Sequence, residues 1–275
     1  MLLNQTIIEK IIEEVRAIAA EEIRPRFRCL NQDEIKTKSS ERDLVTIADQ
    51  NTEAYLTEVF RSLLPPALIV GEEAVSQNPR LLEAITEADL SIIIDPVDGT
   101  WNYANGLPIF GVIIAIVQRG ETVFGLLYDV LLDDWVRTEK GAGAYFVNNT
   151  GSQRLNNSGA SVKQKLDGYV PLHMLSDDKR ETFAHQINEF GVLSTLRCSC
   201  HEYRMVAAGK TDFCLAVSLM PWDHAAGVLA ICEAGGAAGL LDGRAYSPTI
   251  HKGMLVTTSN RDFYDEIIKK MSALR

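Results

Sequence analysis

The stretch that most constrains this chain is residues 92–100, where three isoleucines run directly into an acidic turn. Ile92–Ile94 is a run of β-branched apolar residues, which predicts a buried strand. Pro96 restricts the backbone at the end of this strand, and Gly99 allows conformations that residues with a side chain avoid. We therefore expect the fold to be built around a buried strand that ends in acidic residues.

Asp95 and Asp98 lie three residues apart around this turn, so their carboxylates can point into one small space. Two carboxylates held together repel each other unless a cation or a proton lies between them. Hard oxygen ligands of this kind suit Mg²⁺, which usually takes a few carboxylates and keeps several waters. The alternative is a capped turn in which Asp98 is only the polar residue.

Three further acidic groups stand at the ends of predicted elements. A short apolar segment ends at Glu72 and Glu73, Thr46 and Asp49 form a capping box at a helix start, and Asp223 follows a proline at another helix start. Each has a structural alternative: a solvated loop for the glutamates, a capping acid matched to the helix dipole for Asp49, and an N-cap for Asp223. The repeated design, an apolar element followed by acids, favours one shared site.

Composition limits the class of protein. The chain has 275 residues, 46% of them hydrophobic, and its net charge of −10 argues against nucleic-acid binding. No signal peptide is expected, because Glu9, Glu13 and Glu14 interrupt the apolar residues of an N-terminus without a basic region. The longest apolar run, residues 109–117, is too short for a membrane-spanning helix. We expect a soluble protein with no membrane partner.

The cysteines favour reduced thiols and a cytoplasmic location, because they are odd in number and scattered. Cys198 and Cys200 form a C-x-C pair beside His201, but a zinc site would need a second cluster, and none is evident. The five cysteines are Cys29, Cys198, Cys200, Cys214 and Cys232.

Hydrophobic periodicity and turn residues predict alternating helices and strands, with residues 26–43 irregular. The pattern favours an α+β half, residues 1–150, that carries most of the metal ligands, packed beside an α/β half, residues 151–275, that completes the metal and substrate site. The first helix is expected to begin with a Thr6–Glu9 capping box. Predicted helices are 6–24, 47–64, 79–88, 177–190, 201–208, 223–234 and 263–274; predicted strands are 67–70, 92–94, 109–118, 122–129, 135–138, 144–147, 168–172, 192–196, 212–217 and 254–257.

Four motifs together resemble the inositol monophosphatase family of metal-dependent phosphatases. The resemblance covers nearly the whole chain and follows the family's order. Each motif is moderately specific, and the four at these separations are highly specific. The motifs are Lys38-Ser39-Ser40 with Asp43–Asp49, Gly71-Glu72-Glu73, Asp95–Thr100 and Trp222–Gly227.

This resemblance implies the layered αβαβα sandwich of the inositol monophosphatase and fructose-1,6-bisphosphatase type. It also implies a phosphoric monoester hydrolase that uses two or three Mg²⁺ ions per site, is inhibited by lithium and forms a homodimer. The implied metal ligands are Glu72, Asp95 and the Val97 carbonyl for a first ion, and Asp95, Asp98 and Asp223 for a second, with a third, weaker ion touching Glu72.

The resemblance also assigns the chemistry. Asp49 and Thr100 would orient or deprotonate the attacking water, with Glu72 as a further catalytic residue. The backbone amides of Gly99 and Thr100 would hold the phosphate. Threonine is a weak base alone, but beside a carboxylate it can pass on a proton, so the assignment is chemically sound. The substrate-binding candidates are Asp98, Arg197, Ser199 and Asp223, and Lys38 and Glu73 complete the site. No histidine is assigned to catalysis.

The substrate side departs from inositol-specific members. Ala216 stands where those proteins have a glutamate that binds a sugar hydroxyl, Trp101 replaces a small residue, and Arg197 lies in a segment usually rich in Gly, Thr and Ala. Arg197 could meet a second anionic group or be an exposed arginine. We therefore expect hydrolysis of a small polyol or sugar phosphate such as inositol monophosphate. The alternatives are histidinol phosphate, fructose 1,6-bisphosphate or a 3′-phosphonucleotide, or a regulatory binding protein of the same fold.

Overall fold

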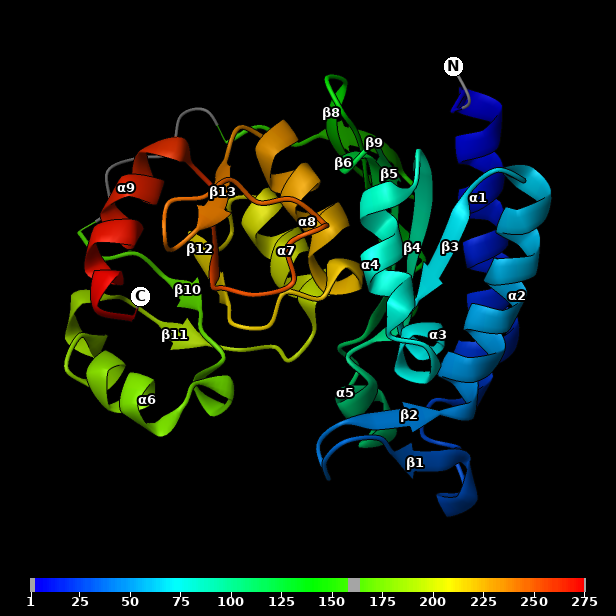
Figure 1. The fold of residues 1–275 in the computed structure, drawn as a ribbon, viewed down its shortest axis with the longest axis horizontal. Coiled ribbons are helices and arrows are strands. Elements are labelled where there is room, and N and C mark those ends of the chain that lie inside the picture. Colours follow the sequence, from blue (N-terminus) through cyan, green and yellow to red (C-terminus); the bar gives the residue numbers. More distant parts are fainter. Residues whose placement is uncertain (1–2, 158–163, 275) are drawn as a thin grey trace.

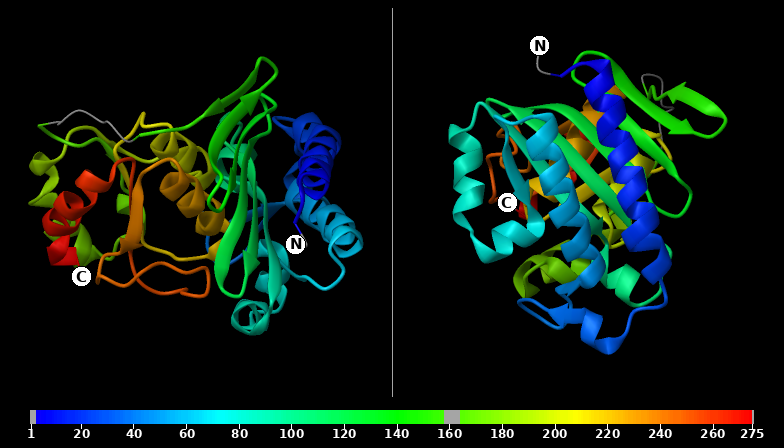
Figure 2. Two further views of the ribbon diagram at one scale, coloured as in Figure 1. Left: turned by 90° about the horizontal axis from the view of Figure 1, so that it is seen from above. Right: turned by 90° about the vertical axis from the view of Figure 1, so that its right-hand side faces the viewer.

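The computed structural model describes residues 3–157 and 164–274, which form five stacked layers (Figures 1 and 2). Helices α1 and α2 cover one face of a large sheet, and α7 and α8 lie between that sheet and a smaller one. Helices α6 and α9 cover the far side of the smaller sheet. The layered αβαβα prediction is confirmed. The helices are α1 (Gln5–Ile18), α2 (Ile47–Leu63), α3 (Glu72–Gln77), α4 (Arg80–Glu87), α5 (Thr100–Ala104), α6 (Asp177–Ala184), α7 (Ser199–Ala207), α8 (Pro221–Glu233) and α9 (Arg261–Lys270).

The large sheet has seven strands in sequence order within the described ranges. β3 and β4 are parallel, and every later neighbour is antiparallel. The predicted hairpin at residues 109–129 is confirmed, and Arg119 and Gly120 make its turn with positive φ values of 50° and 78°. The strands are β3 (Leu68–Gly71), β4 (Leu90–Asp98), β5 (Gly111–Gln118), β6 (Glu121–Asp129), β7 (Asp134–Glu139), β8 (Gly143–Asn148) and β9 (Gly151–Arg154).

Strand β4 is buried along its whole length, as its isoleucines predict. Side chains alternate between the faces of a strand, so its two faces join different cores. Ile92 and Ile94 pack in the core under α1 and α2, whereas Ile93 packs in the core under α8. Both faces are apolar, and the end of β4 is therefore held rigidly in the centre of the molecule.

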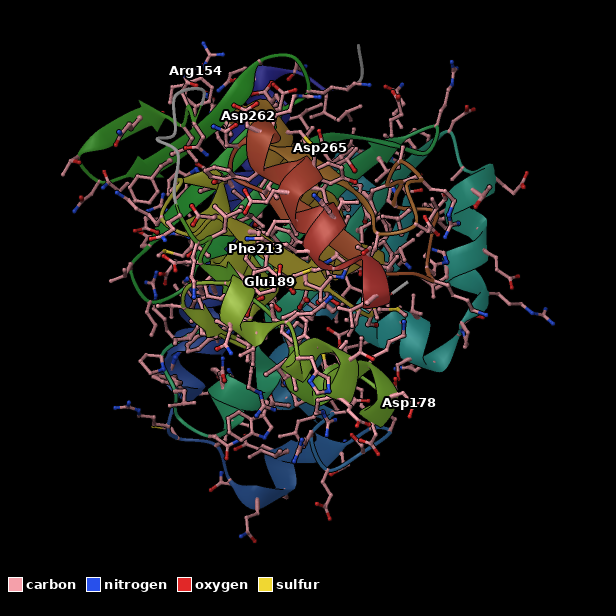
Figure 3. All side chains as sticks on the ribbon, turned by 90° about the vertical axis from the view of Figure 1, so that its left-hand side faces the viewer. Arg154, Asp178, Glu189, Phe213, Asp262 and Asp265 are labelled. Carbon is pink, nitrogen blue, oxygen red and sulfur yellow. The ribbon has the colours of Figure 1, made fainter. Side chains whose placement is uncertain are left out.

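The smaller sheet has the order β11-β10-β12-β14-β13, with β10 parallel to both neighbours and the remaining pairs antiparallel. A separate two-stranded ribbon pairs β1 with β2. Figure 3 views the outer layer, with Asp262 and Asp265 on α9 and Asp178 on α6. The strands are β1 (Ile35–Thr37), β2 (Leu44–Thr46), β10 (Gly168–Tyr169), β11 (Leu193–Ser194), β12 (Phe213–Ala216), β13 (Ala237–Leu240) and β14 (Leu255–Thr258).

The predicted Thr6–Glu9 capping box at the start of the first helix is wrong. The side chain of Asn4 accepts a hydrogen bond from the Ile7 amide at 3.0 Å, so Asn4 is the N-cap. The α-helix ends at Ile18 and continues as a π-helical turn over Ala19–Ile23. An asparagine side chain caps a helix as well as a hydroxyl does, so the helix begins two residues earlier than predicted.

Other differences involve short elements. The region 26–43, expected to be irregular, contains β1, and the helix expected at 177–190 ends at Ala184. The strands expected at 168–172 and 192–196 have only two residues each in the structure. Strands β9 and β13 were not predicted. Two to four residues are too few to show a period-two pattern. No helix in the described ranges is long and apolar enough to cross a membrane, and the five cysteines are free thiols there.

Candidate active site

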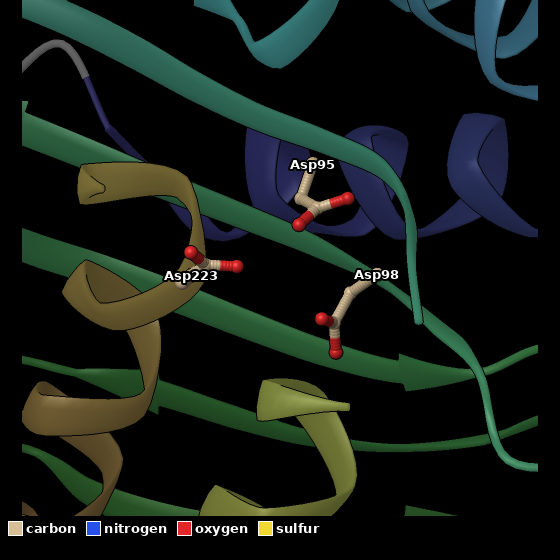
Figure 4. A group of neighbouring side chains, drawn as sticks. All are labelled: Asp95, Asp98 and Asp223. Carbon is tan, nitrogen blue, oxygen red and sulfur yellow. The ribbon is translucent and has the colours of Figure 1, made fainter. Parts of the chain in front are cut away.

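A break in the pairing of β4 with β5 creates the acidic centre of the molecule. Residues three apart on a regular strand point to opposite faces, so Asp95 and Asp98 would be separated. The register shifts between Asp95 and Asp98, where Pro96 has no amide hydrogen to donate to the neighbouring strand. Figure 4 shows both carboxylates directed into the same space.

Asp223 completes this cluster from the first turn of α8. Ligand oxygens from Asp95, Asp98 and Asp223 all lie within 4.8 Å of one another. Asp95 is 1% exposed, and within the described residues its Oδ1 atom is buried without a hydrogen-bond partner. Burial, and then the nearby charges of Glu72 and the other two aspartates, raise the pKa of Asp95. An unpartnered buried carboxylate oxygen among other carboxylates fits a divalent cation.

Asp98 is held in place by the start of α7. Its Oδ2 atom accepts a hydrogen bond from the Cys200 amide at 2.5 Å and from the Cys198 thiol at 3.0 Å, and its Oδ1 atom accepts one from the Ser199 amide at 3.1 Å. Burial raises the pKa of Asp98 to about 6, although these hydrogen bonds oppose the rise. The C-S-C segment thus orients an acidic side chain, a role that its sequence did not reveal.

Asp49 links a helix cap to Thr100. Its Oδ2 atom accepts hydrogen bonds from the Thr46 amide and hydroxyl, at 2.8 and 2.5 Å, which confirms the predicted capping box. Its other oxygen accepts a hydrogen bond from the Thr100 hydroxyl at 3.0 Å, and that hydroxyl also lies 2.9 Å from the Val97 carbonyl. The two carboxylate oxygens of Asp49 therefore have separate partners, the helix cap on one and the Thr100 hydroxyl on the other.

The glutamate pair lies beside a half-buried lysine. The Lys38 ammonium is 2.7 Å from both Glu72 and Glu73. Buried Glu53, which sequence reasoning missed, accepts hydrogen bonds from the amides of Glu73 and Ala74 at 2.8 Å each. A single glutamate on the buried face of α2 was the only signal in the sequence.

The turn after β4 depends on glycine. Gly99 has a φ of 88°, and a Cβ there would lie 3.0 Å from the Ile109 carbonyl oxygen and 3.3 Å from the Cβ of Cys198. Gly99 is the N-cap of α5, so the backbone at Gly99 and Thr100 opens a helix beside the acidic cluster.

Part of this site lines a cavity of about 290 Å³. Its lining residues include Glu72, Asp98 and Asp223, and also Arg197 and Ser199. Ala216 also lines it and offers no polar side-chain atom there. The structure therefore brings Glu72, Asp98 and Asp223 together with the substrate-side candidates in a single space, whereas Asp49 and Asp95 are not among its lining residues.

Without divalent cations, the free energy of unfolding should depend on pH because the pKa of Asp49 is raised in the folded state. Burial raises this pKa to about 7, so between about pH 4 and pH 7 the folded state binds a proton that the unfolded state has released. The unfolding free energy of the wild type, relative to Asp49→Asn, should therefore fall by about 3 kcal/mol as pH rises through this window. Urea unfolding of both proteins in chelator at pH 4.5 and 7.5 measures it.

The comparison with the variant is needed because buried His224, whose pKa is lowered to about 4, titrates in the opposite direction. His224 is unchanged in Asp49→Asn, so its contribution cancels. A difference in stability that is independent of pH would show that Asp49 titrates as an ordinary aspartate.

Residues 4–275 match the inositol monophosphatase family. The chain belongs to the inositol monophosphatase family. Members of this family are phosphatases, so the prediction of a phosphatase enzyme is confirmed. An inositol-1-monophosphatase of Bacillus subtilis is 29% identical over 232 residues, which cover 79% of this chain and 84% of that protein. The protein named Nus factor SuhB of Escherichia coli K12 is 30% identical over 254 residues, 85% of this chain and 88% of that protein.

Solved structures confirm the family fold. The Thermotoga maritima IMPase superimposes with a TM-score of 0.80 at 23% identity, covering 97% of each chain. A structure described as IMPase/NADP phosphatase complexed with Mg²⁺ and phosphate gives a TM-score of 0.80 at 19% identity, covering 97% of this chain and 95% of that one. At these identities the similarity concerns the fold.

Proposed function

We propose that this family member is a Mg²⁺-dependent phosphomonoesterase that hydrolyses a small polyol or sugar phosphate. The observation that carries the proposal is the cluster of buried Asp95 and Asp98 with half-buried Asp223, in which an oxygen of Asp95 has no hydrogen-bond partner among the described residues. This cluster lies beside the hydrogen-bonded pair of Asp49 and Thr100. The family relative complexed with Mg²⁺ and phosphate supports the choice of metal.

The acidic residues would hold the metal. Asp95, Asp98 and Asp223 offer carboxylate oxygens, and Glu72 and the Val97 carbonyl are further candidates for two or three ions. When bound, Mg²⁺ supplies positive charge that neutralises the phosphate and activates water. Lys38 would fix the position of Glu72 and Glu73 through its two short ion pairs.

Thr100 and Asp49 would accept the proton of the attacking water. The Thr100 hydroxyl donates towards Asp49, which leaves a lone pair on its oxygen to accept a hydrogen bond from the water. As the water attacks, a proton can pass to Thr100 while the proton of Thr100 passes to Asp49. The raised pKa of Asp49, about 7 through burial, suits it to accept a proton near neutral pH. The amides of Gly99 and Thr100 would bind the phosphate.

Phosphate release from a substrate panel tests this function. The panel contains inositol 1-phosphate, histidinol phosphate, fructose 1,6-bisphosphate and adenosine 3′,5′-bisphosphate, each with Mg²⁺ and with chelator. We expect turnover that chelator abolishes and that millimolar Li⁺ reduces. Turnover that persists in chelator, or a protein that binds no Mg²⁺ in calorimetry, would contradict the proposal.

The alternative is a regulatory binding protein of the same fold, since one relative is named Nus factor SuhB. Retention of the mutually repelling carboxylates argues against it, because a protein without metal chemistry would gain stability by losing them. The homodimer stays a proposal from the family resemblance, and light scattering would test it. The cytoplasmic location stays a proposal from the odd number and scattered positions of the cysteines.

A further inference from the structure

Arg197 and Trp101 form a pair on the wall of the cavity. The guanidinium carbon of Arg197 lies 3.7 Å from the centre of a Trp101 ring, which is a close cation–π contact. Trp101 is in the first turn of α5, directly after Thr100, and Arg197 directly precedes the Cys198 that contacts Asp98. Both residues replace small ones in the family pattern, so two departures from that pattern meet in one contact.

The backbone of Arg197 is held in a conformation that arginine seldom adopts. Its φ is 55°, in the left-handed region that favours glycine or asparagine. Buried Asn102 fixes this segment, since its side-chain amide donates hydrogen bonds to the carbonyls of Leu196 at 2.8 Å and Ile109 at 2.9 Å. The Arg197 amide also donates to the Thr195 hydroxyl at 3.1 Å. Its position is therefore fixed by the fold.

The lining of the cavity contains a second arginine besides Arg197. Arg42 lines the same cavity, and its positive charge, after burial, lowers the pKa of Arg197. Both arginines also act on His173 at the cavity rim, and burial together with these charges lowers its pKa. Within the described parts of the chain, no ion pair is formed by Arg197 or Arg42. Two guanidinium groups that line one cavity, with no ion-pair partner among the described residues, are favourable for an anion.

We infer that the substrate carries a second anionic group, a phosphate or a carboxylate, which Arg197 and Arg42 bind at the rim while the scissile phosphate lies at the acidic end. This inference rests on the proposed phosphatase function. Trp101 is a positioning residue here, because its ring holds the Arg197 guanidinium without contacting the anion. Ala216 is consistent with this role, since the cavity wall lacks the carboxylate that would bind a neutral hydroxyl at that point.

Matched substrate pairs test the inference by kinetics. The pairs are fructose 1,6-bisphosphate with fructose 1-phosphate, adenosine 3′,5′-bisphosphate with 3′-AMP, and 3-phosphoglycerate with glycerol 3-phosphate. In the wild type, at least one substrate with two anionic groups should have a kcat/KM at least tenfold higher than its partner with one such group. The difference should come mainly from a lower KM. The first two pairs report a second phosphate, and the third reports a carboxylate.

Arg197→Asn should reduce that ratio at least tenfold, because asparagine tolerates the left-handed backbone but carries no charge. Arg197→Lys should keep part of the preference, and Arg42→Gln should also reduce it. The matched control is Arg61→Gln, which removes an exposed arginine paired with Glu58 on α2 and should leave the ratio unchanged. If the enzyme is active but neither Arg197→Asn nor Arg42→Gln changes the ratio, the inference is overturned and the proposed function stays intact.

A binding experiment keeps the inference testable if no substrate is turned over. Alkane bisphosphonates with two to six carbons cannot be hydrolysed, and ethylphosphonate is their counterpart with a single phosphonate group. Calorimetry with Mg²⁺ should show that at least one bisphosphonate binds the wild type at least tenfold more tightly than ethylphosphonate does. This preference should be lost in Arg197→Asn and kept in Arg61→Gln. Equal binding of all these probes, or a preference that Arg61→Gln weakens equally, would overturn the inference.

Discussion

Asp95→Asn should reduce kcat/KM for every phosphomonoester substrate by about 10³-fold or more, because several kcal/mol of charge stabilisation depends on the metal that this cluster would hold. Asparagine is nearly isosteric with aspartate, so the loss would come from charge and not from packing. Asp95 is the residue of choice because its Oδ1 atom has no hydrogen-bond partner among the described residues. The measurement is steady-state phosphate release at saturating Mg²⁺.

The same variant should be more stable than the wild type in chelator, because it removes one of several repelling buried charges. It should also lose most of the increase in Tm that Mg²⁺ gives the wild type. Asp178→Asn is the control, since Asp178 lies exposed on α6 in the outer layer (Figure 3), and both activity and Tm should stay unchanged. Full turnover by Asp95→Asn would refute the metal-site assignment, and unchanged cellular function without turnover would favour the regulatory alternative.

Thr100→Val should reduce kcat by about 10²- to 10⁴-fold with little change in KM, as expected for loss of a proton-transfer group. Valine keeps the shape of threonine but cannot donate to Asp49 or to the Val97 carbonyl. Asp49→Asn should cause a loss of similar size, and the double variant should be little worse than either single one, because the two residues act as a unit.

Thr52→Val is the matched control for Thr100→Val. Thr52 lies on α2, is fully buried, and its hydroxyl has no hydrogen-bond partner within the described residues. Its replacement should therefore leave kcat unchanged and stability unchanged or slightly higher. Additive losses in the Thr100 and Asp49 double variant would show that the two residues do not share one proton path.

Elements with a strong local signal were predictable from the sequence. The capping box of Thr46 and Asp49, the hairpin turn at Arg119-Gly120 and the buried isoleucines of β4 are all confirmed. In each case neighbouring residues in the chain make the decisive contacts or set the pattern. The order of the acidic motifs likewise pointed to the family and to the layered fold.

Short elements lacked such a signal. β10 and β11 have two residues each: β10 forms beside β12, and β11 forms beside β10. The N-cap of α1 was misplaced because Asn4 and Thr6 both suit that position. Local patterns cannot decide between such alternatives, since the energy difference between them is small.

The sequence by itself identified the acidic residues, the buried strand that carries Asp95 and Asp98, and the phosphatase family. The tertiary structure decided how they meet: the register shift in β4 directs Asp95 and Asp98 to one side, and amides from the start of α7 hold Asp98. It also placed Glu53 behind the glutamate pair and Arg197 against Trp101. These contacts join residues between 20 and 102 positions apart, and such distant partners are specified by the packing of whole layers and not by any local pattern.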